Sequence, residues 1–467
     1  MELEKKGMAV QEKSHLRVAW NTAIALVLVT PLVLYLHALL KYGANVPNKD
    51  DYQVVLDFLN RFIQANGFHE KFSLLFRQHW EYRLFFNHIV ELAQYAANGR
   101  VNFVQLMILG SIGWMLAVYI LYTELGSSRL NPAYFIPVML MMFNLTHWSP
   151  MNWAMSSIQN YFGVFFPLAS IYVLTKRPGT AGLICSLFLM AASIFTSGTG
   201  FVLIPVALMA LVSQKRYADF FISSLAASFL LLVFFYFLKY VNPSSAPIYM
   251  KNPLHIMLFS LANLGNTFFG PYILYSFAHS PAVLSTPFFF YGFYASVACG
   301  LAFIAFFVYL AVKGLYKRNG GFVFWAILLI ILISIEIAIG RGSRGLQNAV
   351  LIPRYSLYPL LLISLLYLAG LDFLKDKENK KKLKRFGLAF FVFALLFYAS
   401  TYSPGIWFLN NEHNVLKNRI PDPASQQILM ESDMLGIYQP NWMDGNGNTG
   451  PGMLPSRDYH GDKRVVK

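Results

Sequence analysis

Long apolar stretches separated by short basic connections dominate this sequence of 467 residues. About 20 apolar residues in a row are enough to cross the hydrocarbon core of a bilayer as one helix. Only 13% of the residues are charged, whereas about a quarter are charged in a soluble globular chain. We therefore predict an all-α polytopic membrane protein with about eleven transmembrane helices, not a soluble enzyme. The predicted spans are 18–40, 101–122, 131–148, 160–175, 180–196, 200–213, 218–241, 288–312, 321–340, 355–371 and 386–402.

One further apolar segment, 255–277, contains residues that interrupt helices. These residues are Asn263, Gly265, Asn266, Gly270 and Pro271. Counting this segment as a span would invert the orientation of every later helix. We therefore predict that it is interfacial or re-entrant.

The net charge of +15 is distributed in a way that orients the chain. Lys and Arg residues occupy alternate connections, with the densest cluster at 375–385. Because cytoplasmic loops carry an excess of Lys and Arg, we predict a cytoplasmic N-terminus and a transmembrane body over 1–402. The loop 41–100 and a small, loop-rich segment at 403–467 are then extracytoplasmic. The same distribution argues against a nucleic-acid partner, because the charge follows membrane topology.

The first extracytoplasmic loop opens with an acidic pair, Asp50 and Asp51. Apolar residues then recur at helical spacing over 51–64 and again over 71–97, which predicts two helices lying in the membrane interface. Neighbouring side chains cannot both point the same way, so we expect one carboxylate to face a cavity and the other to cap a helix or pair. A carboxylate here can act as a general base on a hydroxyl. A helix cap with a solvated neighbour is the structural alternative.

The second interfacial segment carries the charged element QHWEYR at 78–83. On a continuous helix, Arg77 would pair with Glu81 and His79 with Arg83, at a spacing of four residues. These residues are candidates for substrate contact, or for surface ion pairs beside an interfacial Trp80. A divalent metal held by Asp51, His79 and Glu81 is left open, although no HExxH spacing occurs.

Arginines also occur in a late outer loop, where orientation does not call for them. Arg341, Arg344 and Arg354 could bind the phosphate of a lipid head group through guanidinium hydrogen bonds. Glu336 lies within a predicted span and is either functional or the partner of Arg341.

Aromatic and polar residues gather in the predicted outer turn at 148–160. Trp153 and Gln159 could line a sugar site, whereas tryptophan at this depth is also a common interfacial anchor.

Together these features resemble bacterial glycosyltransferases of the GT-C class. The resemblance rests on the first span and its acidic outer loop, on a polar outer C-terminal segment, and on Gln78, His79, Glu81, Arg83, Arg354 and Tyr355. The chain is similar to a group of these enzymes with a QHNEHR-like first-loop motif. That motif has Asn and His where this chain has Trp80 and Tyr82.

The resemblance implies an enzyme of the bacterial inner membrane. It would move a sugar from a polyprenyl-phosphate-linked donor to an extracytoplasmic glycan or lipid-glycan acceptor such as lipopolysaccharide. Asp50 or Asp51 would be the catalytic carboxylate, as a base or a metal ligand. Arg354 and Tyr355, with Arg341 or Arg344, would bind donor phosphate, and Gln78, His79, Glu81, Arg83, Trp153, Gln159 and Glu336 would contact substrate. The alternatives are a polymerase or ligase of lipid-linked polysaccharide and a lipid or solute transporter.

Overall fold

The computed structural model describes residues 2–241, 252–267, 269–376 and 380–439. Within this part of the chain, eight helices are long and apolar enough to cross a membrane. The prediction of an all-α polytopic membrane protein is therefore confirmed. These helices are α1 (Glu2–Tyr42), α5 (Phe103–Ser127), α7 (Ala154–Lys176), α10 (Tyr217–Leu232) with the π-helical η5 (Val233–Phe237), α13 (Pro287–Val312), α14 (Phe322–Arg341), α16 (Leu357–Asp376) and α17 (Lys380–Asn418).

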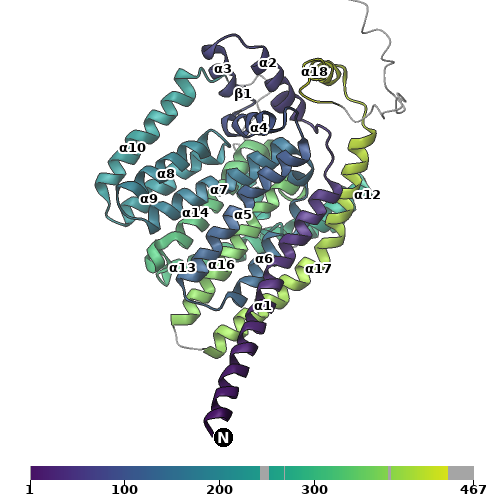
Figure 1. Ribbon diagram of the computed structural model, residues 1–467. Coiled ribbons are helices and arrows are strands. Elements are labelled where there is room, and N and C mark those ends of the chain that lie inside the picture. Colours follow the sequence, from purple (N-terminus) through teal and green to yellow (C-terminus); the bar gives the residue numbers. More distant parts are fainter. Residues whose placement is uncertain (1, 242–251, 268, 377–379, 440–467) are drawn as a thin grey trace, which may run out of the picture.

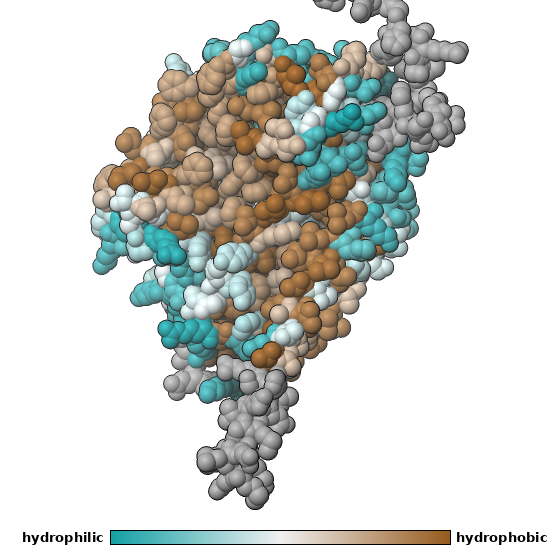
Figure 2. Space-filling model, viewed as in Figure 1, coloured by the Kyte–Doolittle hydropathy of each residue, from teal (hydrophilic) through white to brown (hydrophobic). Residues whose placement is uncertain are grey.

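The long helices run beside one another between two ends of the bundle (Figure 1). The end that carries the first loop is called the hairpin end here, and the end from which α1 begins is called the basic end. Figure 2 shows apolar side chains over the flank of the bundle and hydrophilic side chains gathered toward its two ends. This distribution matches a body surrounded by lipid.

The predicted span 131–148 is not one helix. Helices α5 and α7 both begin at the hairpin end, where Phe103 N donates to Asn45 and Met155 N to Asp51. Both end at the basic end, where Lys176 Nζ lies 2.7 Å from Glu124 Oε2. The chain between them therefore returns across the bundle. It does so through η2 (Pro132–Phe135), α6 (Ile136–Met142), η3 (Leu145–His147) and η4 (Ser149–Asn152). Broken backbone is tolerated at this depth because residues 137–147 are buried in protein, away from lipid.

Two other predicted spans, 180–196 and 200–213, are short helices. α8 (Thr180–Ile194) and α9 (Thr199–Ser213) have 15 residues each. At 1.5 Å per residue, 15 residues extend about 22 Å, which is less than the thickness of a bilayer core. The segment predicted as interfacial or re-entrant forms α11 (Pro253–Gly265) and α12 (Gly270–His279). Helix α11 packs against α13 and α14, and its Asn263 donates to Ser334 Oγ at 2.9 Å.

The first loop contains a β-hairpin that interrupts the predicted helix 71–97. Its elements are η1 (Tyr52–Asp57), α2 (Phe58–Gln64), α3 (Phe68–Leu75), β1 (Gln78–His79), β2 (Tyr82–Arg83) and α4 (Phe85–Asn98). The strands pair Gln78 with Arg83 and His79 with Tyr82. The predicted helical pairs, Arg77 with Glu81 and His79 with Arg83, are therefore wrong. Each of these four side chains has a different partner. Arg77 pairs with Asp57, His79 lies beside Asp50, Glu81 pairs with Arg341, and Arg83 donates to the backbone carbonyl of Leu238.

The C-terminal segment is more helical than predicted. Helix α17 continues past residue 402 to Asn418, and α18 (Pro423–Met434) packs on the first loop. Ser432 Oγ donates to Asn60 Oδ1 at 2.9 Å, and Val101 N donates to Ile437 O at 2.8 Å. The predicted cap thus includes a long helix and a docked short one, and its remainder, 440–467, lies outside the described residues. The other short elements are η6 (Pro281–Ser285), η7 (Leu315–Gly321), η8 (Gly342–Arg344), α15 (Asn348–Leu351) and η9 (Pro353–Ser356).

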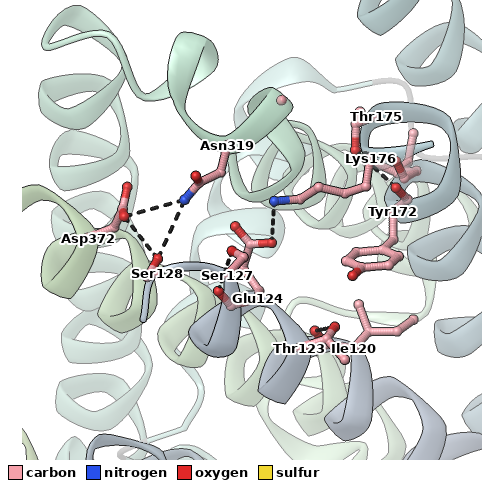
Figure 3. Close-up of polar contacts among 12 residues, drawn as sticks. Ile120, Thr123, Glu124, Ser127, Ser128, Tyr172, Thr175, Lys176, Asn319 and Asp372 are labelled. Carbon is pink, nitrogen blue, oxygen red and sulfur yellow. Dashed lines mark hydrogen bonds and ion pairs between the residues drawn. The ribbon is translucent and has the colours of Figure 1, made fainter. Parts of the chain in front are cut away.

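A polar network joins the helices at the basic end (Figure 3). Beside the Glu124–Lys176 pair, Ser128 Oγ donates to Asp372 Oδ1 at 2.9 Å, and Asn319 Nδ2 lies 3.4 Å from the same oxygen. The space enclosed there measures about 10 Å³, close to the size of one water. The network therefore holds α5, α7 and α16 together and leaves no room for a larger ligand.

Candidate functional site

Asp51 caps helix α7. Its side chain is fully buried and accepts hydrogen bonds from Met155 N at 2.8 Å, Asn48 N at 3.0 Å and Ala154 N at 3.3 Å. The first N–H groups of a helix have no partner within the helix, so a carboxylate at this position satisfies them. Burial raises the pKa of Asp51 to about 7, although the three donors oppose the shift. Asp51 therefore anchors the loop to α7 and is turned away from solvent.

The raised pKa of Asp51 predicts a pH-dependent contribution to stability. The folded protein takes up the proton near pH 7, whereas the unfolded chain takes it up near 3.8. The stabilising contribution is thus complete below about pH 3.8 and is lost as the pH rises to about 7. We expect the difference in melting temperature between the wild type and Asp51→Asn, which does not titrate, to fall as the pH is raised from 4 to 7. A difference that is constant over this range would contradict the prediction.

Asp50 is arranged differently from its neighbour. Its side chain is 37% exposed, and its Oδ2 lies 3.7 Å from His79 Nε2. The backbone carbonyl of Asp50 accepts from Val54 N at 2.8 Å, which fixes the residue at the start of η1. His79 Nε2 is buried and has no hydrogen-bond partner within the described residues. Asp50 therefore presents an accessible carboxylate beside an imidazole.

The Trp153 ring lies against two cations that are distant from each other in the sequence, one of them the neighbour of Asp50. Lys49 Nζ lies 4.9 Å from the centre of the indole ring, and the Arg354 guanidinium lies 5.5 Å from it. Lys49 Nζ is also 4.0 Å from Glu412 Oε1 on α17. Burial lowers the pKa of Lys49, and Arg354 lowers it further, against the opposing influence of Glu412 and Asp50. We call Lys49, Asp50, His79, Trp153 and Arg354 the Trp153 cluster.

A second group lies on the same end of the bundle. Arg341 pairs with Glu81 and donates to Tyr82 Oη at 2.8 Å. A methyl group on Gly198 would lie 2.9 Å from Glu336 Oε1 and 3.1 Å from Tyr82 Cε1, so a side chain at 198 would collide with this group. The guanidinium of Arg341 interacts electrostatically with two carboxylates, those of Glu81 and Glu336. Arg341 is therefore engaged by partners inside the protein, with Glu81 as its ion-pair partner.

Several predicted substrate residues have structural partners. Arg83 is only 4% exposed and donates to Phe76 O at 2.7 Å and Leu238 O at 2.6 Å. Gln78 donates to Trp80 O and Val241 O, both at 2.6 Å. These bonds tie the hairpin to the end of η5. Gln159 and Tyr355 are buried, at 9% and 6% exposed, and the side chain of Arg344 lies outside the described part.

No three His, Cys, Asp or Glu residues are grouped closely enough to hold a metal in the described part of the chain. The three predicted ligands are directed to different places. Asp51 faces α7, His79 faces Asp50, and Glu81 faces Arg341.

Sequence reasoning missed Lys49, Tyr82 and Glu412. The available signal for Lys49 was its place beside the acidic pair in a predicted outer loop, where the predicted orientation does not require a cation. Glu412 had no such signal, because the predicted tail gave no reason to bring it to the first loop.

Comparison of the chain with protein-family models, with curated proteins and with solved structures gives no match.

Proposed function

We propose that this protein is a GT-C-like membrane glycosyltransferase. It moves a sugar from a polyprenyl-phosphate-linked donor to a glycan or lipid-glycan acceptor. The observation that carries the proposal is the Trp153 cluster, where an accessible carboxylate, two cations and an aromatic ring lie together at one end of the bundle. Such a set supplies a base for a hydroxyl, cations for a phosphate and an apolar surface for a sugar face.

The proposal includes eleven crossings and a defined orientation. The eight long helices, the short α8 and α9, and the broken segment 128–153 make up the crossings, with α11 and α12 re-entrant. The basic connections orient the hairpin end to the outside of the bacterial inner membrane, with the N-terminus in the cytoplasm. A lipid-linked donor and an envelope acceptor are both available on that side.

The proposed mechanism is a single displacement. Asp50 removes a proton from an acceptor hydroxyl, whose oxygen then forms a bond to the anomeric carbon of the sugar. The bond from that carbon to the phosphate oxygen breaks, and the electron pair leaves with the polyprenyl phosphate. Arg354 and Lys49 stabilise the charge on the leaving group. His79 Nε2 lies 3.7 Å from Asp50 Oδ2, next to the carboxylate that accepts the proton. The product has the inverted anomeric configuration.

Replacing Arg354 by alanine should weaken donor binding by about 10- to 100-fold, because one charge-assisted contact to phosphate contributes about 1.5–3 kcal/mol. Binding of a polyprenyl-phosphate sugar to the protein in nanodiscs measures this effect. Arg354→Lys should recover part of the affinity, because it keeps the charge without the planar guanidinium. Arg177→Ala, at the basic end, is the matched control. Unchanged donor affinity in Arg354→Ala would exclude the phosphate role.

A further inference from the structure

A cavity of about 720 Å³ lies beside the hairpin and away from the Trp153 cluster. Helix α3, the hairpin and the end of η5 form its walls. Phe76, Trp80 and Phe237 supply aromatic surface, and Arg77, Arg83 and Lys239 supply positive charge. The mechanism proposed above uses none of these six residues.

The charge of the cavity is positive. No Asp or Glu is among the described residues that line it. Outside the wall, Asp57 pairs with both Arg77, at 2.6 Å, and Arg61, at 2.9 Å, so one carboxylate is shared between two guanidinium groups. Arg83 uses its two terminal nitrogens on backbone carbonyls, while its buried Nε has no partner within the described part of the chain. An anion in this cavity would therefore meet an excess of donors.

The cavity lies at the hairpin end of α10. In Figure 1 this helix runs along one side of the bundle toward α3. Leu232, Phe235, Tyr236 and Phe237 continue its exposed apolar surface up to the cavity, with exposed fractions of 48%, 47%, 73% and 60%. An amphiphile could thus place its chain on α10 and its head in the cavity without leaving the membrane boundary.

The hairpin separates the cavity from the Trp153 cluster. Side chains of successive strand residues point to opposite faces. Gln78 and Arg83, which pair across the strands, contribute to the cavity. His79 and Tyr82, the other pair, face Asp50 and Arg341. Each face of the six-residue element QHWEYR therefore serves a different site.

We propose that this cavity binds the phosphate head of a membrane lipid whose chains lie along α10. The ligand chemistry is a lipid phosphate, provided either by a bilayer phospholipid or by a polyprenyl phosphate. The guanidinium groups and Lys239 bind the phosphate, and the aromatic walls cover the first apolar part of the lipid. This binding does not depend on glycosyl transfer, so it stands or falls separately from the proposed function.

Native mass spectrometry of the full chain with added lipid tests the proposal. The probes are phosphatidylglycerol, undecaprenyl phosphate and uncharged diacylglycerol. The variant Lys239→Gln should lower the retention of phosphate lipid by about tenfold, and Lys239→Gln combined with Arg77→Gln by more. Lys215→Gln is the matched control, because Lys215 also has a positive φ, 58° against 50°, but lies at the basic end.

The outcomes are distinct. Loss of phosphatidylglycerol retention in the Lys239 variants assigns the site to bilayer phospholipid, and loss of undecaprenyl phosphate alone assigns it to the carrier lipid. Retention of diacylglycerol equal to that of both phosphate lipids would overturn the proposal, as would equal effects of Lys239→Gln and Lys215→Gln. Because Arg77 also pairs with Asp57, the double variant could unfold for a structural reason. In that case the single variant Lys239→Gln tests the proposal. The melting temperature of Lys239→Gln should match that of the wild type.

Discussion

Replacing Asp50 by asparagine should lower sugar transfer by about 10²- to 10⁴-fold, the usual contribution of a general base. The amide keeps the size of the side chain but cannot accept the proton of the acceptor hydroxyl. The fold should be retained, because the Asp50 side chain is 37% exposed and the hydrogen bonds that Asp50 accepts from Gln53 N and Val54 N go to its backbone carbonyl. Turnover of a purified polyprenyl-phosphate sugar, measured with the melting temperature of the same preparation, gives the result.

Asp433→Asn is a suitable control for that experiment. Asp433 is an exposed carboxylate on α18, at the same end of the bundle, and it has no place in the Trp153 cluster. Its replacement should leave turnover unchanged. Full turnover in Asp50→Asn would remove the base assignment, and donor binding by that same variant would show whether the phosphate site survives without it.

Replacing Asp51 by alanine should destabilise the protein by about 3 kcal/mol. Three backbone N–H groups lose their acceptor, two of them at the buried start of α7, and each unsatisfied buried donor costs about 1–3 kcal/mol. Met155 and Ala154 are themselves buried, so water cannot easily replace the carboxylate. Denaturant unfolding in a defined detergent measures the loss, and an unfolding midpoint equal to that of the wild type would contradict it.

The two aspartate experiments separate catalysis from folding. Asp51→Asn should retain much of the stability, because an amide oxygen still accepts from the helix start. Any remaining folded fraction of an Asp51 variant should transfer sugar at near the wild-type rate. If Asp51→Asn were as inactive as Asp50→Asn while melting normally, Asp51 would be the base and the assignment would be reversed.

The membrane body was predictable because hydrophobic length is a local property. A run of apolar residues such as 18–40 contains its own reason to cross a bilayer. The break in the segment 128–153 was not predictable in this way. There, Met141, Met142 and Leu145 are as apolar as the residues of any span, and burial against neighbouring helices permits an irregular backbone.

The hairpin at 78–83 could not be predicted from local spacing. Arg77 and Glu81 are placed for a helical ion pair, but their partners are Asp57 and Arg341. A surface pair at helical spacing contributes less than about 0.5 kcal/mol, which buried tertiary contacts easily exceed. The partners of Arg341 and Arg354 could not be predicted from local spacing either, because they also come from distant parts of the chain. Only the tertiary structure shows that Arg341 pairs with Glu81, while Arg354 and Lys49 both lie over Trp153.

The sequence by itself determined that this chain is a polytopic helical membrane protein, and it drew attention to the acidic pair, because composition and hydrophobic length act residue by residue. The tertiary structure decided which aspartate is accessible and which arginine is paired with a carboxylate, and it revealed the cavity on the second face of the hairpin. Burial, pairing and desolvation depend on partners that are hundreds of residues apart in the chain. Glu412 and Lys49, or Arg354 and Trp153, meet only when the helices pack.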